Sequence, residues 1–267
     1  MRIARFTTGE DPRFGLVEGA AGEEVLRVVV GDPLYAPLQP TGEQVPLADA
    51  RLLAPVIPRS KVVGIGRNYV DHAKELGNDV PDEPLMFLTP NTAVVGPGDP
   101  VVLPEGSQEV HYEGELAVVI GRVCKDVPRE RVPEVVFGYT CANDVTARDW
   151  QRSDGQWARA KGFDTSCPLG PWIVTDLDVS DLFLRTRLDG RTVQDGRTRD
   201  LVFDVPELVS TVSRAFTLLP GDVILTGTPS GVGPIAPGQR VECSIEGLGT
   251  LTSTVAGADP TSTAGLR

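Results

Sequence analysis

The sequence is poor in the basic residues on which nucleic-acid and membrane binding depend. Its 267 residues include 25 lysines and arginines against 37 aspartates and glutamates, a formal net charge of −12. Nucleic acids and anionic lipid surfaces carry negative charge and select for basic protein surfaces. We therefore expect neither nucleic acid nor membrane as a partner. An anionic small molecule would need a local basic pocket.

Cysteine, histidine and long apolar segments are also scarce. The four cysteines are far apart and form no C-x-x-C pair, which favours free thiols in a reducing compartment over a disulfide framework. There is no run of 18 apolar residues and no apolar signal-peptide segment near the first residue, so we expect a cytoplasmic protein. Only His72 and His111 are available as histidine bases at neutral pH.

Strand-like patterns dominate what is present. Strand candidates at residues 2–6, 14–17 and 25–30 precede a linker that contains two prolines. We therefore expect a small N-terminal β-rich domain at residues 1–58 and a larger domain at residues 59–267. The expected fold class is α+β, dominated by β structure.

Four further segments of the second domain have a predicted structure. An amphipathic stripe predicts a helix that opens at Asp204 and ends at Pro220-Gly221. A short helical piece is expected at residues 133–137, a loop at residues 157–165, and a disordered tail after Val255.

The segment from His111 to Gly121 combines an apolar strand pattern with two carboxylates at its start. Alternate residues of a strand face the same side, so Glu113 and Glu115 point the same way. Asp144, about thirty residues further on, offers a third carboxylate in an apolar setting. Like charges beside a core persist only where a cation or several donors neutralise them. The three acids therefore predict a site for a hard cation.

The residues alone leave simpler interpretations of these acids open. Glu113 and Glu115 could lie on the exposed face of an edge strand and pair with arginines. Asp144 could cap the N-terminus of a helix.

Other candidate site residues stand on predicted helices and loops. On a short helix ended by Gly77, His72 and Glu75 are i, i+3 neighbours, which is also the spacing of an ordinary surface pair. If a helix begins between Thr146 and Trp150, Arg148 and Gln151 share a face near the third acid.

Two loop segments complete the set. Lys161 is flanked by glycine and apolar residues. The loop at Gly227 and Thr228 could be a simple turn, or its backbone N–H groups and hydroxyl could hold an anion. It is not a Walker motif, because the lysine is missing.

The segments HYEGELAVVIG, NDVTARDWQ, KGFDT and LTGTPSGVG occur here in one order. Together they resemble the fumarylacetoacetate hydrolase family, over about residues 61 to 255. The resemblance implies a mixed β-roll fold and a homodimer. It also implies that His72 and Glu75, in GRNYVDHAKE, form a catalytic dyad on a mobile lid, and that the three acids hold Mg²⁺, which Mn²⁺ or Ca²⁺ could replace.

The reaction implied by the resemblance is Mg-dependent cleavage of a C–C bond in a 2-oxo acid with a 4-carbonyl or 4-carboxyl group. An acylpyruvate hydrolase or oxaloacetate decarboxylase would pass through an enolate whose charge the metal stabilises. The alternative is a 2-hydroxyhepta-2,4-diene-1,7-dioate isomerase or a related decarboxylase. A non-catalytic binding protein on the same scaffold and Schiff-base chemistry at Lys161 are further hypotheses.

The resemblance also suggests a role for each candidate. Arg148, Gln151 and Lys161 would orient or polarise the far carbonyl of the substrate. Gly227 and Thr228 would hold its carboxylate. The dyad histidine would activate water.

Overall fold

The computed structural model describes residues 1–258, in which strands far outnumber helices. The disorder expected after Val255 falls mainly on residues 259–267, which lie outside this range, whereas the last strand continues to Ala256. The α-helices of the described residues are α1 (Val70–Glu75), α2 (Arg148–Ser153), α3 (Ala158–Gly162) and α4 (Val205–Ala215). Short 3₁₀ helices are η1 (Leu47–Asp49), η2 (Asn91–Ala93), η3 (Arg129–Glu134) and η4 (Thr198–Asp200). Among these described helices, none has the length and apolar character needed to cross a bilayer.

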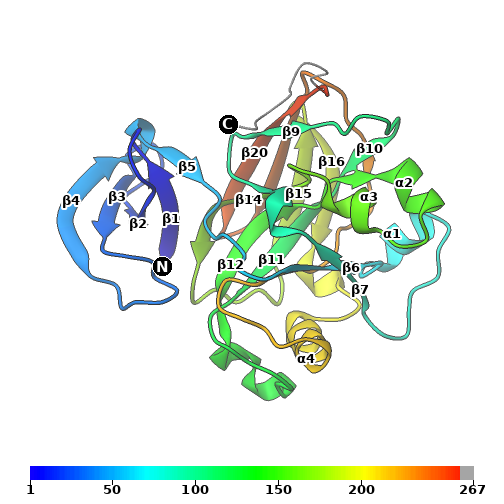
Figure 1. Ribbon diagram of the computed structural model, residues 1–267, viewed down its shortest axis with the longest axis horizontal. Coiled ribbons are helices and arrows are strands. Elements are labelled where there is room, and N and C mark those ends of the chain that lie inside the picture. Colours follow the sequence, from blue (N-terminus) through cyan, green and yellow to red (C-terminus); the bar gives the residue numbers. More distant parts are fainter. Residues whose placement is uncertain (259–267) are drawn as a thin grey trace.

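The largest sheet has twelve strands and runs through both parts of the chain. Its strands are β1 (Arg2–Thr7), β2 (Arg13–Glu18), β3 (Val25–Val29), β4 (Pro40–Pro46), β5 (Arg51–Leu53), β6 (Val62–Gly66), β7 (Leu85–Thr89), β8 (Val94–Val95), β11 (Gly114–Ile120), β12 (Val136–Asn143), β14 (Cys167–Val174) and β17 (Val223–Leu225). The main order is β4-β3-β2-β1-β14-β12-β11-β17-β6-β7. In Figure 1, β1 to β5 form a lobe beside the rest of the molecule. Since β1 pairs with β14, the sheet continues from that lobe into the larger part, and the domain boundary at residue 58 stays a prediction.

Two smaller sheets complete the fold. The five-stranded sheet contains β9 (Pro100–Val102), β15 (Phe183–Leu188), β16 (Arg191–Arg197), β19 (Arg240–Ile245) and β20 (Gly249–Ala256). The three-stranded sheet contains β10 (Val110–Tyr112), β13 (Thr146–Ala147) and β18 (Gly233–Pro234). Figure 1 shows α1, α2 and α3 on the side of the molecule away from the N-terminal lobe.

Strand β11 lies at the centre of the core, and all seven of its residues are buried. Leu116 and Val118 pack into the hydrophobic cluster that includes α4 and the five-stranded sheet. Ala117 and Val119 pack into a second cluster on the opposite face. Because side chains alternate along a strand, Glu115 shares the face of Ala117, as predicted.

The structure corrects several local predictions. Residues 158–162 form α3, where a loop was expected. The helical piece expected at residues 133–137 is a 3₁₀ helix that ends at Glu134, because β12 begins at Val136. Helix α4 is capped by Asp204, whose carboxylate accepts the N–H of Glu207. It ends at Ala215, before the predicted Pro220-Gly221, because the chain turns extended so that Leu218 can pair with Cys124.

Candidate active site

Glu113 lies at the point where the chain leaves one sheet and enters another. Strand β10 ends at Tyr112 and β11 begins at Gly114. The Glu113 N–H donates to the Asn143 side chain (2.9 Å), and the Glu113 carbonyl accepts the Asp144 N–H (2.9 Å). The change of sheet thus fixes the first glutamate beside the end of β12.

The three predicted acids converge at this point. Carboxylate oxygens of Glu113, Glu115 and Asp144 lie within 4.8 Å of one another, and the three residues are at most 3% exposed. The edge-strand interpretation is therefore wrong, because β11 is a central strand with partners on both sides. The capping interpretation of Asp144 is also wrong, since α2 has Ala147 at its N-cap and no side-chain cap.

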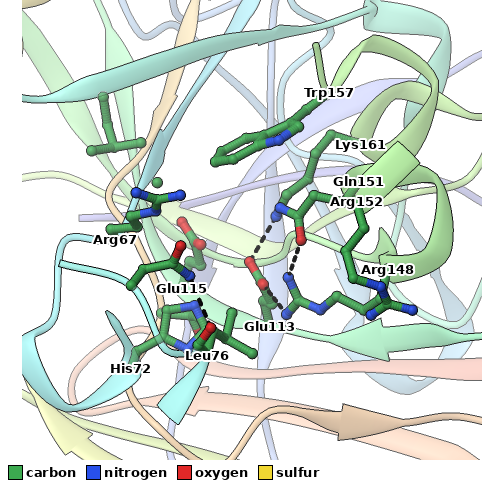
Figure 2. Close-up of a pocket in the computed structure, with 14 residues that line it drawn as sticks. Arg67, His72, Leu76, Glu113, Glu115, Arg148, Gln151, Arg152, Trp157 and Lys161 are labelled. Carbon is green, nitrogen blue, oxygen red and sulfur yellow. Dashed lines mark hydrogen bonds and ion pairs between the residues drawn. The ribbon is translucent and has the colours of Figure 1, made fainter. Parts of the chain in front are cut away.

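Two buried cations neutralise part of this charge (Figure 2). The Lys161 ammonium donates to Glu113 (2.8 Å) and to Asp144 (2.6 Å), and the Arg148 guanidinium pairs with the other oxygen of Glu113. Arg148 also donates to Gln151 (2.9 Å), one turn further along α2, as their spacing predicts.

The acids differ sharply in their electrostatic surroundings. Burial acts to raise the pKa of Glu113, but the charges of Lys161 and Arg148 outweigh it and lower the value to about 2. Burial raises the pKa of Asp144 to about 6 in spite of Lys161. Burial, Asp144 and Glu113 together raise the pKa of Glu115 well above its ordinary value. The Glu115 carboxylate accepts a hydrogen bond from the Gly227 N–H (2.7 Å). The cluster therefore still has more negative charge than its surroundings neutralise.

This donor set fits a hard divalent cation. Asp144 Oδ1 is buried and has no hydrogen-bond partner among the described residues. Glu115 also offers a carboxylate oxygen to this cluster. Carboxylate oxygens are the ligands that Mg²⁺, Mn²⁺ and Ca²⁺ prefer. A divalent ion would offset the burial and the mutual repulsion that raise the pKa values of Glu115 and Asp144.

Helix α1 carries the predicted dyad. His72 is 5% exposed, and its Nδ1 lies 3.5 Å from a carboxylate oxygen of Glu75. Burial lowers the pKa of His72. The negative charge of Glu113 acts to raise this pKa, and the positive charge of Arg148 acts to lower it. A lowered pKa leaves the imidazole neutral at pH 7, the form that accepts a proton. The Glu75 carboxylate also accepts the Gly231 N–H (3.1 Å), which ties α1 to the loop after β17.

The loop at Gly227 and Thr228 contacts the strand that holds the acids. Gly227 has φ +101°, and a Cβ there would lie 2.8 Å from the Asn68 side chain, so the position requires glycine. Its N–H already donates to Glu115, and the Thr228 hydroxyl donates to the Gly114 carbonyl (2.9 Å). The role of this loop in holding a substrate carboxylate stays a prediction, and Glu115 competes for that N–H.

One cavity of about 340 Å³ joins these groups. It is lined by Ile65, Gly66, Arg67, His72, Leu76, Asn78, Glu113, Glu115, Arg148, Gln151, Arg152, Trp157, Lys161 and Thr228. Three other predicted residues are connected to these lining groups: Asp144 through Lys161, Glu75 beside His72, and Gly227 through Glu115.

The sequence reasoning missed three residues at this site. Arg67 and Trp157 line the cavity, and Gln194 on β16 donates to Thr228 (2.8 Å) and accepts the Gly114 N–H (3.0 Å). Arg67 lies inside the GRNY motif, which was a usable signal. Gln194 belongs to a hairpin 80 residues from Gly114, and no local pattern marks it.

We predict that residues 69–82 behave as a lid that a bound ligand stabilises. The segment has charged and turn-forming residues, and Val70 and Leu76 are 41% and 40% exposed. Apart from the buried Tyr69 and Ala73, little apolar burial therefore holds it down. Hydrogen exchange of residues 69–82 should slow when oxalate is added to the metal-loaded protein. Equal protection with metal alone and with metal plus oxalate would contradict this.

Comparisons with known proteins identify the family. The family model for the fumarylacetoacetate (FAA) hydrolase C-terminal domain matches residues 61–256, and an Rv2993c-like N-terminal model matches residues 1–55. The human oxaloacetate tautomerase FAHD2A, mitochondrial, is 46% identical over 222 residues, which are 79% of this chain and 71% of that protein.

The similar solved structures include an isomerase and a hydrolase. The crystal structure of 5-carboxymethyl-2-hydroxymuconate delta-isomerase from Mycobacterium smegmatis is 51% identical, with a TM-score of 0.90 over 97% of this chain and 100% of that one. Fumarylpyruvate hydrolase from Pseudomonas aeruginosa, in complex with Mn²⁺ and pyruvate, is 37% identical, with a TM-score of 0.72 over 76% of this chain and 91% of that one. The chain therefore belongs to the fumarylacetoacetate hydrolase family of enzymes.

Proposed function

We propose that this enzyme cleaves a C–C bond in a 2-oxo acid with a 4-carbonyl or 4-carboxyl group, with Mg²⁺ as its cofactor. The observation that carries the proposal is the convergence of Glu113, Glu115 and Asp144 beside a cavity. The two glutamates line this cavity together with a histidine and two buried cations. A divalent ion held by these acids would polarise the ketone oxygen of a chelating 2-oxo acid and hold the negative charge left by bond cleavage. Mn²⁺ or Ca²⁺ could replace Mg²⁺.

The protein's own groups supply the remaining steps. Glu75, whose carboxylate lies 3.5 Å from Nδ1, would orient the His72 ring so that Nε2 could accept a proton from water. The activated water would attack the carbonyl at position 4, while Arg148, Gln151 and Lys161 orient that carbonyl and offer N–H donors to its developing oxyanion. Closure of α1 over the cavity would exclude bulk water.

Two observations favour a second candidate, an isomerase or tautomerase. The relatives named above include an isomerase at 51% identity and an oxaloacetate tautomerase at 46% identity. Both reactions shift a proton within a 2-oxo acid skeleton, and His72 could move that proton without water attack. A 2-hydroxyhepta-2,4-diene-1,7-dioate isomerase remains the specific alternative.

Schiff-base chemistry at Lys161 is disfavoured by the structure. Burial acts to lower the pKa of Lys161, but Asp144 and Glu113 outweigh it and raise the value above the ordinary one. A protonated amine bound to two carboxylates is not a nucleophile.

A substrate panel tests the proposal directly. Oxaloacetate, acetylpyruvate, fumarylpyruvate and a 2-hydroxyhepta-2,4-diene-1,7-dioate should be assayed with Mg²⁺, with detection of both cleavage and isomerisation. We expect cleavage of at least one 4-carbonyl or 4-carboxyl substrate. Isomerisation without cleavage would replace the proposal with the second candidate, and no reaction with any member would leave a binding protein on the family scaffold.

We also propose that the enzyme is a cytoplasmic homodimer. Its four cysteines are free, which fits a reducing compartment, and the dimer is carried over from the family resemblance. Light scattering at micromolar concentration should give twice the mass of one chain, and the mass of a single chain would contradict the dimer.

A further inference from the structure

Among residues 1–258, Arg67 differs from the other cations that line the cavity because no carboxylate pairs with it. Arg148 and Lys161 pair with Glu113, and Arg152 pairs with Glu109 outside the cavity. Within residues 1–258, no carboxylate lies at ion-pairing distance from the Arg67 guanidinium, although its side chain lines the cavity. Figure 2 shows Arg67 across the cavity from Arg148 and Gln151.

The backbone of Arg67 adopts an unfavourable conformation. Its φ is +59°, in the left-handed region that is unfavourable for a non-glycine residue. The next residue, Asn68, is fully buried and fixes the turn: its side chain donates to the carbonyls of Phe203 (3.0 Å) and Thr226 (2.8 Å) and accepts the Phe203 N–H (2.8 Å). The turn is therefore held by interactions that do not involve the Arg67 side chain.

Charge balance indicates what Arg67 is for. With a divalent ion bound, Glu113, Glu115 and Asp144 together with Arg148 and Lys161 would carry one net positive charge. The carboxylate of a monocarboxylic 2-oxo acid neutralises that charge. Arg67 then remains as one further positive charge in a partly buried cavity, where an unmatched charge is costly.

We infer that Arg67 is the counter-charge for a second carboxylate, so that the preferred substrate is a dicarboxylic 2-oxo acid. The inference rests on the proposed function, because the metal end of the cavity is taken to bind the 2-oxo acid group. The guanidinium suits this role, since its planar donors match a carboxylate and can bind it through two parallel hydrogen bonds. Arg67 is thus a specificity-determining residue, with no part in the bond-breaking step.

The test compares binding of stable 2-oxo acids that differ only at the far end. The two pairs are 2-oxoglutarate with 2-oxopentanoate and 2-oxoadipate with 2-oxohexanoate, each titrated calorimetrically into the Mg²⁺-loaded protein. In at least one pair the dicarboxylate should bind about tenfold to 100-fold more tightly, the range of a charge-assisted hydrogen bond. Arg67→Gln should reduce this preference to about threefold or less while leaving the monocarboxylate Kd within about twofold.

Two further variants make the result specific. Arg67→Lys keeps the charge without the planar fork and should retain part of the preference, which a purely structural role of Arg67 would not predict. Arg152→Gln removes a cavity cation that already has a partner, with 63% of its side chain exposed, and should keep the full preference. The inference is overturned if the wild type binds both members of each pair equally, if Arg67→Gln keeps the preference, or if none of the four acids binds.

This measurement needs no turnover, so its failure can be told apart from failure of the proposed function. A preference that depends on Arg67, in a protein that cleaves nothing in the substrate panel, would support the inference and overturn the proposed reaction. Cleavage of acetylpyruvate by an enzyme without the preference would do the opposite.

Discussion

Glu115→Gln is expected to weaken metal binding by more than about 100-fold. Loss of a residue that only supports a metal ligand typically weakens binding about 10- to 100-fold, and loss of a ligand itself should cost more. The amide keeps the shape of the side chain but removes one of the three negative charges of the site. Calorimetric titration of the variant with Mn²⁺ gives the affinity directly. An unchanged affinity would mean that the metal, if any, binds elsewhere.

The same variant should keep its fold and gain relative stability in the absence of metal. Glu115 is buried, and its pKa is raised above the ordinary value of 4.5. A raised carboxyl pKa makes its full contribution to the stability of the folded state below pH 4.5. This contribution is lost progressively as the pH rises from 4.5 through the folded-state value. The metal-free wild type should therefore lose unfolding free energy as the pH rises above about 4.5, and Glu115→Gln should lose less.

Glu109→Gln is the matched control for this experiment. Glu109 is two residues before His111 in the same segment, but its side chain is 37% exposed and pairs with Arg152. The variant should bind Mn²⁺ within about twofold of the wild type, because an exposed charge outside the cluster is screened by solvent. A large loss in both variants would indicate general damage to the segment.

His72→Gln is expected to lower kcat for hydrolysis by about 10²- to 10⁴-fold, the usual contribution of a positioned general base. Metal affinity should be retained, because His72 is outside the carboxylate cluster. The matched control is His111→Gln, which changes the other histidine of the chain and should leave hydrolysis within about threefold. Equal losses in the two variants would remove His72 from the reaction.

The pH profile of the wild type gives a second check on the same residue. The neutral imidazole is the active form, and burial lowers its pKa below 6.5. More than half of the imidazole should therefore be neutral at pH 6.5, and hydrolysis should fall as the pH is lowered through the His72 pKa. If oxaloacetate decarboxylation is the reaction, no water attack is needed, and His72→Gln should cost that reaction much less.

The sequence predicted the acids well because their signal is local. Alternation along β11 places Glu115 on the face of Ala117 whatever the rest of the chain does. The i, i+3 spacings of His72 with Glu75 and of Arg148 with Gln151 are also local signals. By contrast, the edge-strand and capping alternatives could be rejected only with the strand order in hand, because β12 and β17 come from distant parts of the chain.

What the sequence could not predict depends on contacts between distant segments. Lys161 was expected in a loop, yet α3 carries its ammonium to Glu113, 48 residues away. Strand β4 was missed because six of its seven residues are exposed and it begins and ends with proline. It forms because the edge of β3 offers it backbone partners. Within residues 1–258, no carboxylate pairs with Arg67. This could be seen only once the positions of the surrounding carboxylates were known.

The most direct test of the account is calorimetric titration of oxalate into the protein with and without Mg²⁺. Oxalate presents the same pair of chelating oxygens as a 2-oxo acid and cannot react. The account predicts binding with one site per chain when Mg²⁺ is present, and loss of that binding after chelation or in Glu115→Gln. Equal binding of oxalate with and without the metal would contradict the claim that the buried carboxylates hold a cation for a 2-oxo acid.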